Sequence, residues 1–206
     1  MLRIGLTGGI ASGKSSVSEL FSRRGIPVVD TDIISRQLLD IDQPGYHQVL
    51  NHFGRGILLK NQQIDRLQLR RLIFNNTVEK EWLEATLHPV IYQKTQQLIK
   101  TNIAAAYVLV VIPLLFESDF GALVDRVLVI DCSAETQIRR LLARDNIDRA
   151  LANQMLAQQW KNKDRLAQAD DVIDNDIDFD LDRQVTKLHT QYLALANSVS
   201  TETRQL

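Results

Sequence analysis

Residues 5–16 read GLTGGIASGKSS and contain four of the nine glycines in the chain. From Gly8 to Ser15 they satisfy G-x-x-x-x-G-K-[ST], a pattern that binds phosphate groups where a strand meets a helix. The glycines let successive backbone N–H groups point at phosphate oxygens, and the following helix adds donors and partial positive charge. Lys14 supplies charge for the β- and γ-phosphates, and the Ser15 hydroxyl is a ligand for Mg²⁺. We expect a phosphate site formed by Gly9, Ile10, Ala11, Ser12, Gly13, Lys14, Ser15 and Ser16.

The sequence around this motif has the context that the motif requires. An apolar run, Arg3–Thr7, precedes it, and a helical pattern over Lys14–Arg24 follows. A glycine-rich turn with an accidental lysine is the alternative, and the match and its context together disfavour it. The dinucleotide-binding pattern G-x-G-x-x-G is not matched.

Two carboxylates, Asp30 and Asp32, stand in VVDTD at the end of the second apolar run. A carboxylate beside a triphosphate is repulsive unless it takes a proton or holds a metal ion. Kinases that act on alcohols use such an aspartate to orient and deprotonate the hydroxyl. Alternatively, the pair caps the helical stretch IISRQLL, and the two roles can coexist, one on each aspartate.

A group of basic residues follows later in the chain. Arg140 and Arg144 are four residues apart, so they share a helix face. Arg139 precedes Arg140 directly. With the basic residues up to Arg165, they predict a lid whose arginines close on the polyphosphate. A surface helix with salt bridges such as Glu135–Arg139 is the alternative.

Four further features have two interpretations each. His88-Pro89 marks either a helix start or a contact to the acceptor. Trp82 and Trp160 are interpreted as packing residues rather than ligand platforms. Glu117 either holds a metal ion or is a solvated loop residue, and the loop is the default.

The elements that must position these residues alternate between strand and helix. Helical patterns follow the first and fourth of five short apolar runs, which favours an α/β fold with right-handed crossovers and a parallel sheet. Uninterrupted apolar runs are typical of strands covered on both faces. The expected strands are Arg3–Thr7, Pro27–Val29, Tyr107–Ile112, Arg126–Ile130 and Asp171–Ile173.

More than seventy residues separate the second and third runs, which is too many for one crossover helix. Amphipathic patterns over 65–74 and 78–87 predict a helical lobe inserted at about 33–100. The basic excursion predicts the lid at about 140–165. The core of a single domain then comprises about 1–32, 101–139 and 166–206.

Composition excludes several classes of protein. The 206 residues carry a net charge of −1, which gives no basic field for nucleic acid. The only cysteine, Cys132, excludes an intrachain disulfide and fits a reducing compartment. The chain has no apolar run long enough to span a membrane and no apolar start of signal-peptide length. We expect a cytoplasmic protein that is a monomer or a weak homo-oligomer.

The motifs GLTGGIASGKS, VVDTDIISR, HFG, IDRLQLR, LHP, VIPLLFE, RVLVID, RRLLARD and ADDVIDN occur in an order that resembles bacterial dephospho-coenzyme A kinases. The resemblance covers roughly residues 3 to 190. It implies a P-loop kinase-like, parallel five-stranded sheet with flanking helices, an inserted helical acceptor lobe and a helical lid. One departure is Ala11, where the family usually has glycine; alanine is small, and we expect the change to be tolerated.

The resemblance also implies an activity and residue roles. The activity is ATP- and Mg²⁺-dependent phosphorylation of the ribose 3′-hydroxyl of dephospho-coenzyme A, the last step of coenzyme A synthesis. Asp32 would be the base, Arg36 and His88 would contact the acceptor, Arg140 and Arg144 the phosphates, and Asn175 would lie near the adenine.

Two other functions are weighed against this one. A nucleoside or nucleoside-monophosphate kinase has the same core and is separated by which acceptors support ADP formation. A GTPase-like switch would carry an N-K-x-D guanine motif, which the sequence lacks.

Overall fold

The structure is a computed structural model, and it describes residues 1–176 and 180–202. Two compact units divide the chain. The first contains Met1–Asp30 and the described residues from Ile99 onward, and the second is Thr31–Leu98.

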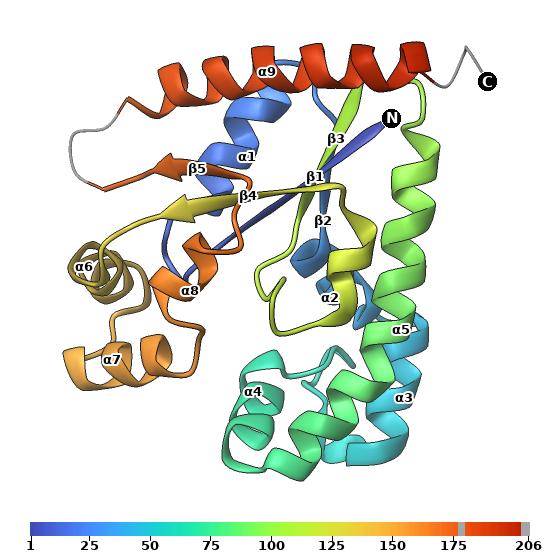
Figure 1. The fold of residues 1–206 in the computed structure, drawn as a ribbon. Helices are drawn as coiled ribbons and strands as arrows, with labels where there is room; N and C mark the ends of the chain where they lie inside the picture. Colours follow the sequence, from blue (N-terminus) through green and yellow to red (C-terminus); the bar gives the residue numbers. More distant parts are fainter. Residues whose placement is uncertain (177–179, 203–206) are drawn as a thin grey trace. The chain divides into compact units, whose positions relative to one another are not determined.

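A five-stranded parallel sheet lies at the centre of the first unit (Figure 1). The strand order is β2-β3-β1-β4-β5, and every pairing is parallel, as the sequence predicts. Each expected strand is present within one or two residues of its predicted ends. The strands are β1 (Leu2–Gly8), β2 (Val28–Asp30), β3 (Tyr107–Val111), β4 (Arg126–Asp131) and β5 (Asp171–Asp174).

The central strand, β1, carries the phosphate loop. Its neighbours are β3 and β4, with Gly5 in register with both Val110 and Val127. All five residues of β3 are buried, which explains its uninterrupted apolar sequence. Because parallel strands end at the same edge, β1 places the loop beside the carboxyl ends of β3 and β4.

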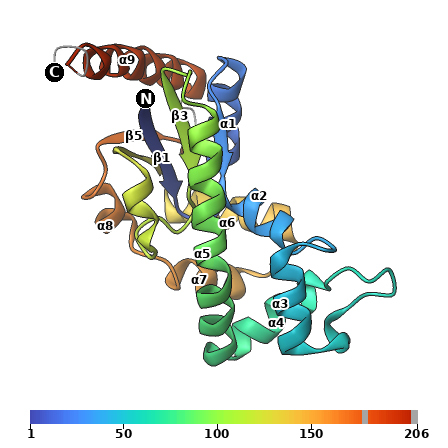
Figure 2. The same cartoon turned by 90° about the vertical axis from the view of Figure 1, so that its right-hand side faces the viewer.

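Two helices, α1 (Lys14–Arg23) and α9 (Leu181–Glu202), pack together over one face of this sheet (Figure 2). Phe21 of α1 and Tyr192 of α9 are fully buried and stack at 6.3 Å between ring centroids. Tyr107 meets both rings edge-on. Burial of these large side chains holds α1, which follows the phosphate loop, against the sheet.

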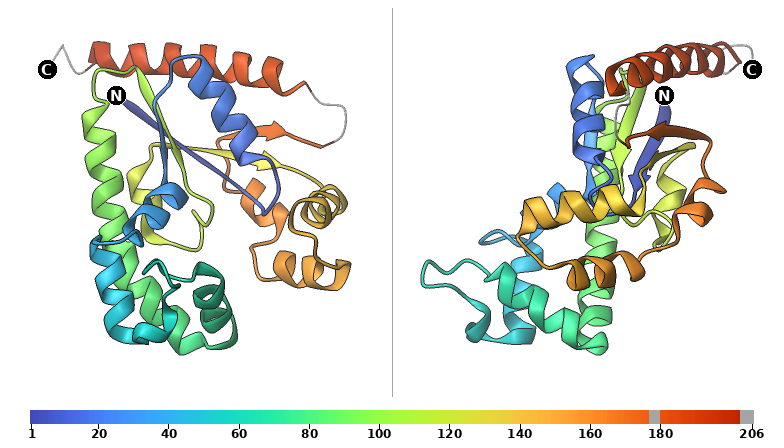
Figure 3. Two further views of the ribbon diagram at one scale, coloured as in Figure 1. Left: turned by 180° about the vertical axis from the view of Figure 1, so that it is seen from behind. Right: turned by 90° about the vertical axis from the view of Figure 1, so that its left-hand side faces the viewer.

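Three helices lie between β4 and β5: α6 (Ala134–Asp145), α7 (Arg149–Ala157) and α8 (Asn162–Leu166). Ser133 and Asp148 cap α6 and α7 through their side chains. The two helices pack side by side (Figure 3), and a small apolar cluster between them includes Ile10 and Ala11 of the loop.

The second unit consists mainly of helices. It contains α2 (Thr31–Leu38), α3 (Pro44–Phe53), a short 3₁₀ turn (Arg55–Ile57), α4 (Arg66–Asn75) and most of α5 (Thr77–Thr101). Another 3₁₀ turn, Asp119–Leu123, lies in the first unit.

One interpretation of His88-Pro89, that it starts a helix, is wrong. Both residues lie inside α5, which begins at Thr77. Proline in a helix removes one hydrogen bond, but Leu87 and Ile91 on either side are buried. Packing of this apolar side holds the helix together across the proline.

Trp82 is a packing residue, as predicted. Its ring stacks on His52 at 3.6 Å between centroids and meets Phe53 edge-on. His52 is also paired with Glu79 at 2.6 Å.

Candidate active site

The phosphate loop connects β1 to α1 with two residues in left-handed conformations. Gly13 has φ +103° and Ala11 has φ +55°. A side chain at Gly13 would also overlap the amide nitrogen of Asn175. Glycine is therefore required at position 13 both by its backbone and by its neighbour. Ala11 adopts a conformation that costs a non-glycine residue about 1–2 kcal/mol, so a glycine would be less strained there.

Lys14 extends back across this loop. Its Nζ donates to the carbonyl oxygens of Gly8 at 2.8 Å and Gly9 at 3.0 Å. Ser15 and Ser16 follow in the first turn of α1 and are exposed. The loop, the ammonium group and the N-terminus of the helix together form an anion site of the predicted kind.

Arg140 of α6 contacts the outer side of the loop. Its Nη1 lies 3.4 Å from the carbonyl oxygen of Ala11 and 3.3 Å from that of Ser12, and its Nη2 donates to the carbonyl oxygen of Asn175 at 2.9 Å. Burial raises the pKa of the nearby Cys132 thiol, and the charge of Arg140 opposes that rise. The structure thus brings Arg140 to the phosphate loop.

Asn175, directly after β5, supports the same part of the loop. Its Nδ2 donates to the carbonyl oxygen of Ser12 at 2.6 Å, and its side chain is buried. The structure therefore gives Asn175 a contact that the sequence did not predict. Its placement near adenine stays a prediction.

Arg144 is directed elsewhere. Its Nε and Nη2 donate to the two carboxylate oxygens of Asp145, at 2.8 and 2.7 Å, on the exposed surface.

The predicted salt bridge between Glu135 and Arg139 is wrong, because Glu135 pairs with Arg149 of α7. That pairing ties α6 to α7 across the turn between them, which a helix considered alone cannot reveal.

Three further side chains complete the surroundings of the loop, and of these the sequence pointed only to Arg165, as a member of the basic stretch that predicts the lid. Gln159 accepts a hydrogen bond from the N–H of Ile10 at 2.8 Å. Gln137 and Arg165 lie so close to Gly9 that any side chain there would meet them. The only sequence signal for Arg165 is its place in the basic stretch after α7.

Two buried side-chain atoms in the described part of the chain have no hydrogen-bond partner: Ser12 Oγ and Arg165 Nε. Both belong to residues at the phosphate loop. Burial lowers the pKa of Arg165, and the charges of Glu117 and Asp131 oppose that shift. Unpaired buried donors are rare and destabilising, so their location at one loop points to a ligand site.

Two carboxylates lie near Arg165: Glu117, in the segment that follows β3, and Asp131, the last residue of β4. Glu117 accepts the backbone N–H of Trp160 at 3.4 Å, and Asp131 accepts the Asn162 amide at 2.5 Å. Trp160 stacks on Phe116 at 5.4 Å between ring centroids and is still 41% exposed, so its interpretation as a packing residue stays a prediction.

The predicted acceptor residues belong to the second unit. Asp32 lies in the first turn of α2, two residues beyond the end of β2, and Arg36 lies one turn later on the same exposed side. His88 is exposed on α5.

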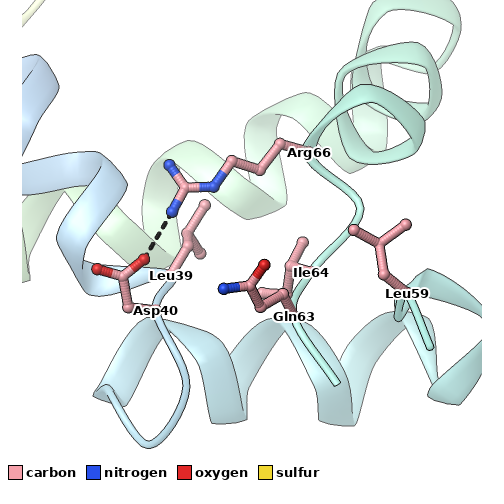
Figure 4. Close-up of a pocket in the computed structure, with 6 residues that line it drawn as sticks. All are labelled: Leu39, Asp40, Leu59, Gln63, Ile64 and Arg66. Atoms are coloured by element: carbon pink, nitrogen blue, oxygen red, sulfur yellow. Dashed lines mark hydrogen bonds and ion pairs between the residues drawn. The ribbon is translucent and has the colours of Figure 1, made fainter. Parts of the chain in front are cut away.

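A hollow of about 370 Å³ lies beyond the end of α2, within the second unit (Figure 4). Arg66 spans it, donating to Asp40 and to the carbonyl oxygen of Arg36, both at 2.8 Å. Its remaining lining combines apolar side chains with one amide, from Leu39, Leu59, Gln63 and Ile64.

Within the described residues there is no cluster of three or more His, Cys, Asp or Glu that could hold a metal ion. A divalent cation bound by the Ser15 hydroxyl would therefore need further oxygen atoms from a bound phosphate group. Among the described helices, none has the length and apolarity needed to cross a membrane.

Comparisons with known proteins agree with this geometry. A family model described as dephospho-CoA kinase matches residues 2–180. The chain is similar to the dephospho-CoA kinase of Mannheimia succiniciproducens, with 42% identity over 202 residues, 96% of this chain and 94% of that protein. It is 45% identical to that of Escherichia coli K12 over 195 residues, 94% of each. The solved structure of a dephospho-CoA kinase from Campylobacter jejuni matches with a TM-score of 0.68 and 27% identity, covering 92% of this chain and 96% of that one.

Proposed function

The chain belongs to the dephospho-CoA kinase family, and we propose that it transfers the γ-phosphoryl group of ATP to the ribose 3′-hydroxyl of dephospho-CoA, giving coenzyme A and ADP. The observation that carries this proposal is the family match over a complete phosphate loop. Lys14, the left-handed Gly13 and the N-terminus of α1 form that loop at the end of the central strand.

The phosphate loop binds the ATP polyphosphate. Backbone N–H groups and Lys14 hold the β- and γ-phosphates, and Arg140 and Asn175 keep the loop in shape from outside. Arg144 would reach the phosphates only after leaving Asp145, as a lid residue does on closing.

Mg²⁺ is the cofactor we propose, because a hydroxyl and phosphate oxygens are the hard ligands that it prefers. Ser15 would hold it at the start of α1. When bound, Mg²⁺ neutralises the charge that develops on the phosphate oxygens. We leave Glu117 out of this role, since its Oε1 already accepts from Trp160.

Asp32 is the proposed general base. Its carboxylate accepts the proton of the 3′-hydroxyl as the oxygen forms a bond to the γ-phosphorus atom, and the bond to the bridging oxygen of ADP breaks. Arg36, one turn along α2, and His88 contact the acceptor. All three side chains are exposed, so a substrate can approach them.

The hollow beyond α2 is where we place the pantetheine arm of the acceptor. Asp32 and Arg36 lie one turn apart on α2, about 6 Å along its axis, and Asp40 follows two residues after the helix ends at Leu38. The arm contains amide groups and a dimethyl carbon. The hollow offers matching groups in Gln63, Leu59 and Ile64.

The sequence expectations of a cytoplasmic location and a monomer or weak homo-oligomer stand as proposals. We likewise propose that the protein binds neither nucleic acid nor a membrane.

An acceptor panel tests the activity. ADP release is measured with Mg²⁺ and ATP on dephospho-CoA, nucleosides, nucleoside monophosphates and coenzyme A itself, whose 3′-position is already phosphorylated. We expect turnover with dephospho-CoA and none with coenzyme A. Turnover confined to a nucleoside or a nucleoside monophosphate would replace the proposed acceptor.

Two variants test the base. Asp32→Asn keeps the size of the side chain but removes its basicity, so kcat should fall by about 10²- to 10⁴-fold with little change in ATP affinity. The matched control Asp30→Asn should lose less. A near-normal kcat in Asp32→Asn would exclude Asp32 as the base, and a collapse confined to Asp30→Asn would transfer the role.

A further inference from the structure

The guanidinium group of Arg165 has one edge that the protein leaves unused. Nη1 donates to the carbonyl oxygen of Trp160 at 2.8 Å, which fixes the group in place. On the other edge, Nε has no partner, and Nη2 makes only a long contact of 3.4 Å with Asn162. The side chain is 5% exposed, so water does not substitute for the missing acceptor.

The same Nε/Nη2 edge is a carboxylate-binding fork elsewhere in this protein. Arg126 uses it on Asp171, at 2.6 and 3.1 Å, and Arg144 uses it on Asp145. Two parallel N–H donors match two oxygens of a carboxylate or a phosphate group. Arg165 therefore presents an oxyanion fork without its oxyanion.

Neither nearby carboxylate fills this fork. Glu117 and Asp131 are close enough for their charges to act on Arg165, but neither is hydrogen-bonded to its Nε, which has no partner. A buried donor left unpaired destabilises a protein, and this penalty is relieved when an oxygen ligand arrives.

The position of the fork identifies its ligand. Nη2 lies 2.8 Å from the point where a Cβ of Gly9 would be, and Lys14 Nζ is bonded to the carbonyl oxygen of that same glycine. The lysine of this motif serves the β- and γ-phosphates. Arg165 and Lys14 thus both lie beside Gly9 of the phosphate loop.

We propose that Arg165 is a ligand of the γ-phosphate, with its Nε/Nη2 fork binding the terminal oxygens of ATP beside Gly9. The inference rests on the proposed function, since it takes ATP as the donor. Because Nε is shielded in this structure, the oxygens reach it only when the residues covering it move aside.

Nucleotide binding by the full-length protein tests this role without any acceptor. Calorimetry compares Arg165→Lys, which keeps the charge and loses the fork, with wild type, using Mg²⁺ with either ADP or the imido-bridged ATP analogue that is not hydrolysed. We expect Arg165→Lys to bind the analogue about 10- to 100-fold more weakly and ADP within about twofold of wild type. The control Arg183→Lys, an exposed arginine on α9, should bind both normally.

Equal losses for the two nucleotides, or no loss for either, would overturn the assignment to the γ-phosphate. A wild-type protein that binds neither nucleotide would instead contradict the proposed function itself.

A second measurement needs no substitution. In wild-type protein with isotope-labelled arginine, the Nε–H signal of Arg165 should shift on adding the Mg²⁺-bound ATP analogue and stay in place with ADP. A signal that responds equally to both nucleotides, or to neither, would overturn the proposal even if the variant failed to fold.

Discussion

Asn175 links the last strand to the phosphate loop, and its removal should affect both stability and phosphate binding. Its Nδ2 donates to the carbonyl oxygen of Ser12 at 2.6 Å in a buried setting. Arg140 still lies 3.3 Å from that oxygen, so the carbonyl is not left without a donor in Asn175→Ala. We therefore expect a loss in the lower part of the range for a buried hydrogen bond, about 1–2 kcal/mol. For a chain of this size the Tm should fall by about 2–8 °C.

Asn175→Asp gives this prediction a sharper form. At neutral pH the new carboxylate faces a carbonyl oxygen, so the variant should be less stable than Asn175→Ala. A protonated carboxyl group donates again, and burial should raise its pKa above the usual value of about 3.9. The additional defect should therefore shrink as the pH falls through that raised pKa. Asn51→Asp, on the exposed side of α3, is the control and should lack this recovery.

The assay combines urea unfolding at two pH values with calorimetry of the binding of Mg²⁺-tripolyphosphate. This ligand has the phosphates of ATP but no adenine. If Asn175 supports the loop, Asn175→Ala should weaken tripolyphosphate and ATP alike. Unchanged stability, with a loss for ATP and none for tripolyphosphate, would refute the supporting role and leave Asn175 as an adenine contact.

Three further outcomes are expected. Lys14→Ala should weaken ATP handling at every Mg²⁺ concentration, whereas excess Mg²⁺ should partly rescue Ser15→Ala; identical Mg²⁺ dependence would contradict this division. Burial and the charge of Arg24 lower the pKa of His189 in the folded protein. The imidazole of His189 therefore binds a proton more readily in the unfolded chain. As a result, the free energy of unfolding should fall as the pH drops below about 6.5. His189→Gln should flatten that slope in urea titrations. Leu59→Glu should raise the KM for dephospho-CoA and leave that for ATP unchanged; an unchanged acceptor KM would remove the hollow from the acceptor site.

Much of the fold was predictable because its signals are local. The buried strand β3 appears in the sequence as an unbroken apolar run, and the phosphate loop as a fixed spacing between Gly8 and Ser15. The helix through Pro89 was not predictable, since buried residues on both sides of the proline override its local preference.

The surroundings of the loop depend on contacts between distant residues. Asn175 and Ser12 are 163 positions apart, and Gln159 and Ile10 are 149 apart. No spacing rule connects such pairs. The unused fork of Arg165 is also invisible in the sequence, because it depends on what neighbouring side chains leave unpaired.

The central claim is that the phosphate loop and Asp32 act together on a ribose hydroxyl. Its most direct test is a single-turnover reaction of ATP, Mg²⁺ and dephospho-CoA, with the phosphorylated position of the product assigned by phosphorus–proton NMR. Wild-type protein should give coenzyme A with the new phosphate on the 3′-oxygen, and Asp32→Asn should form the same product about 10²- to 10⁴-fold more slowly. Phosphate on another atom, no product with wild-type protein, or an equal rate in Asp32→Asn would contradict the claim.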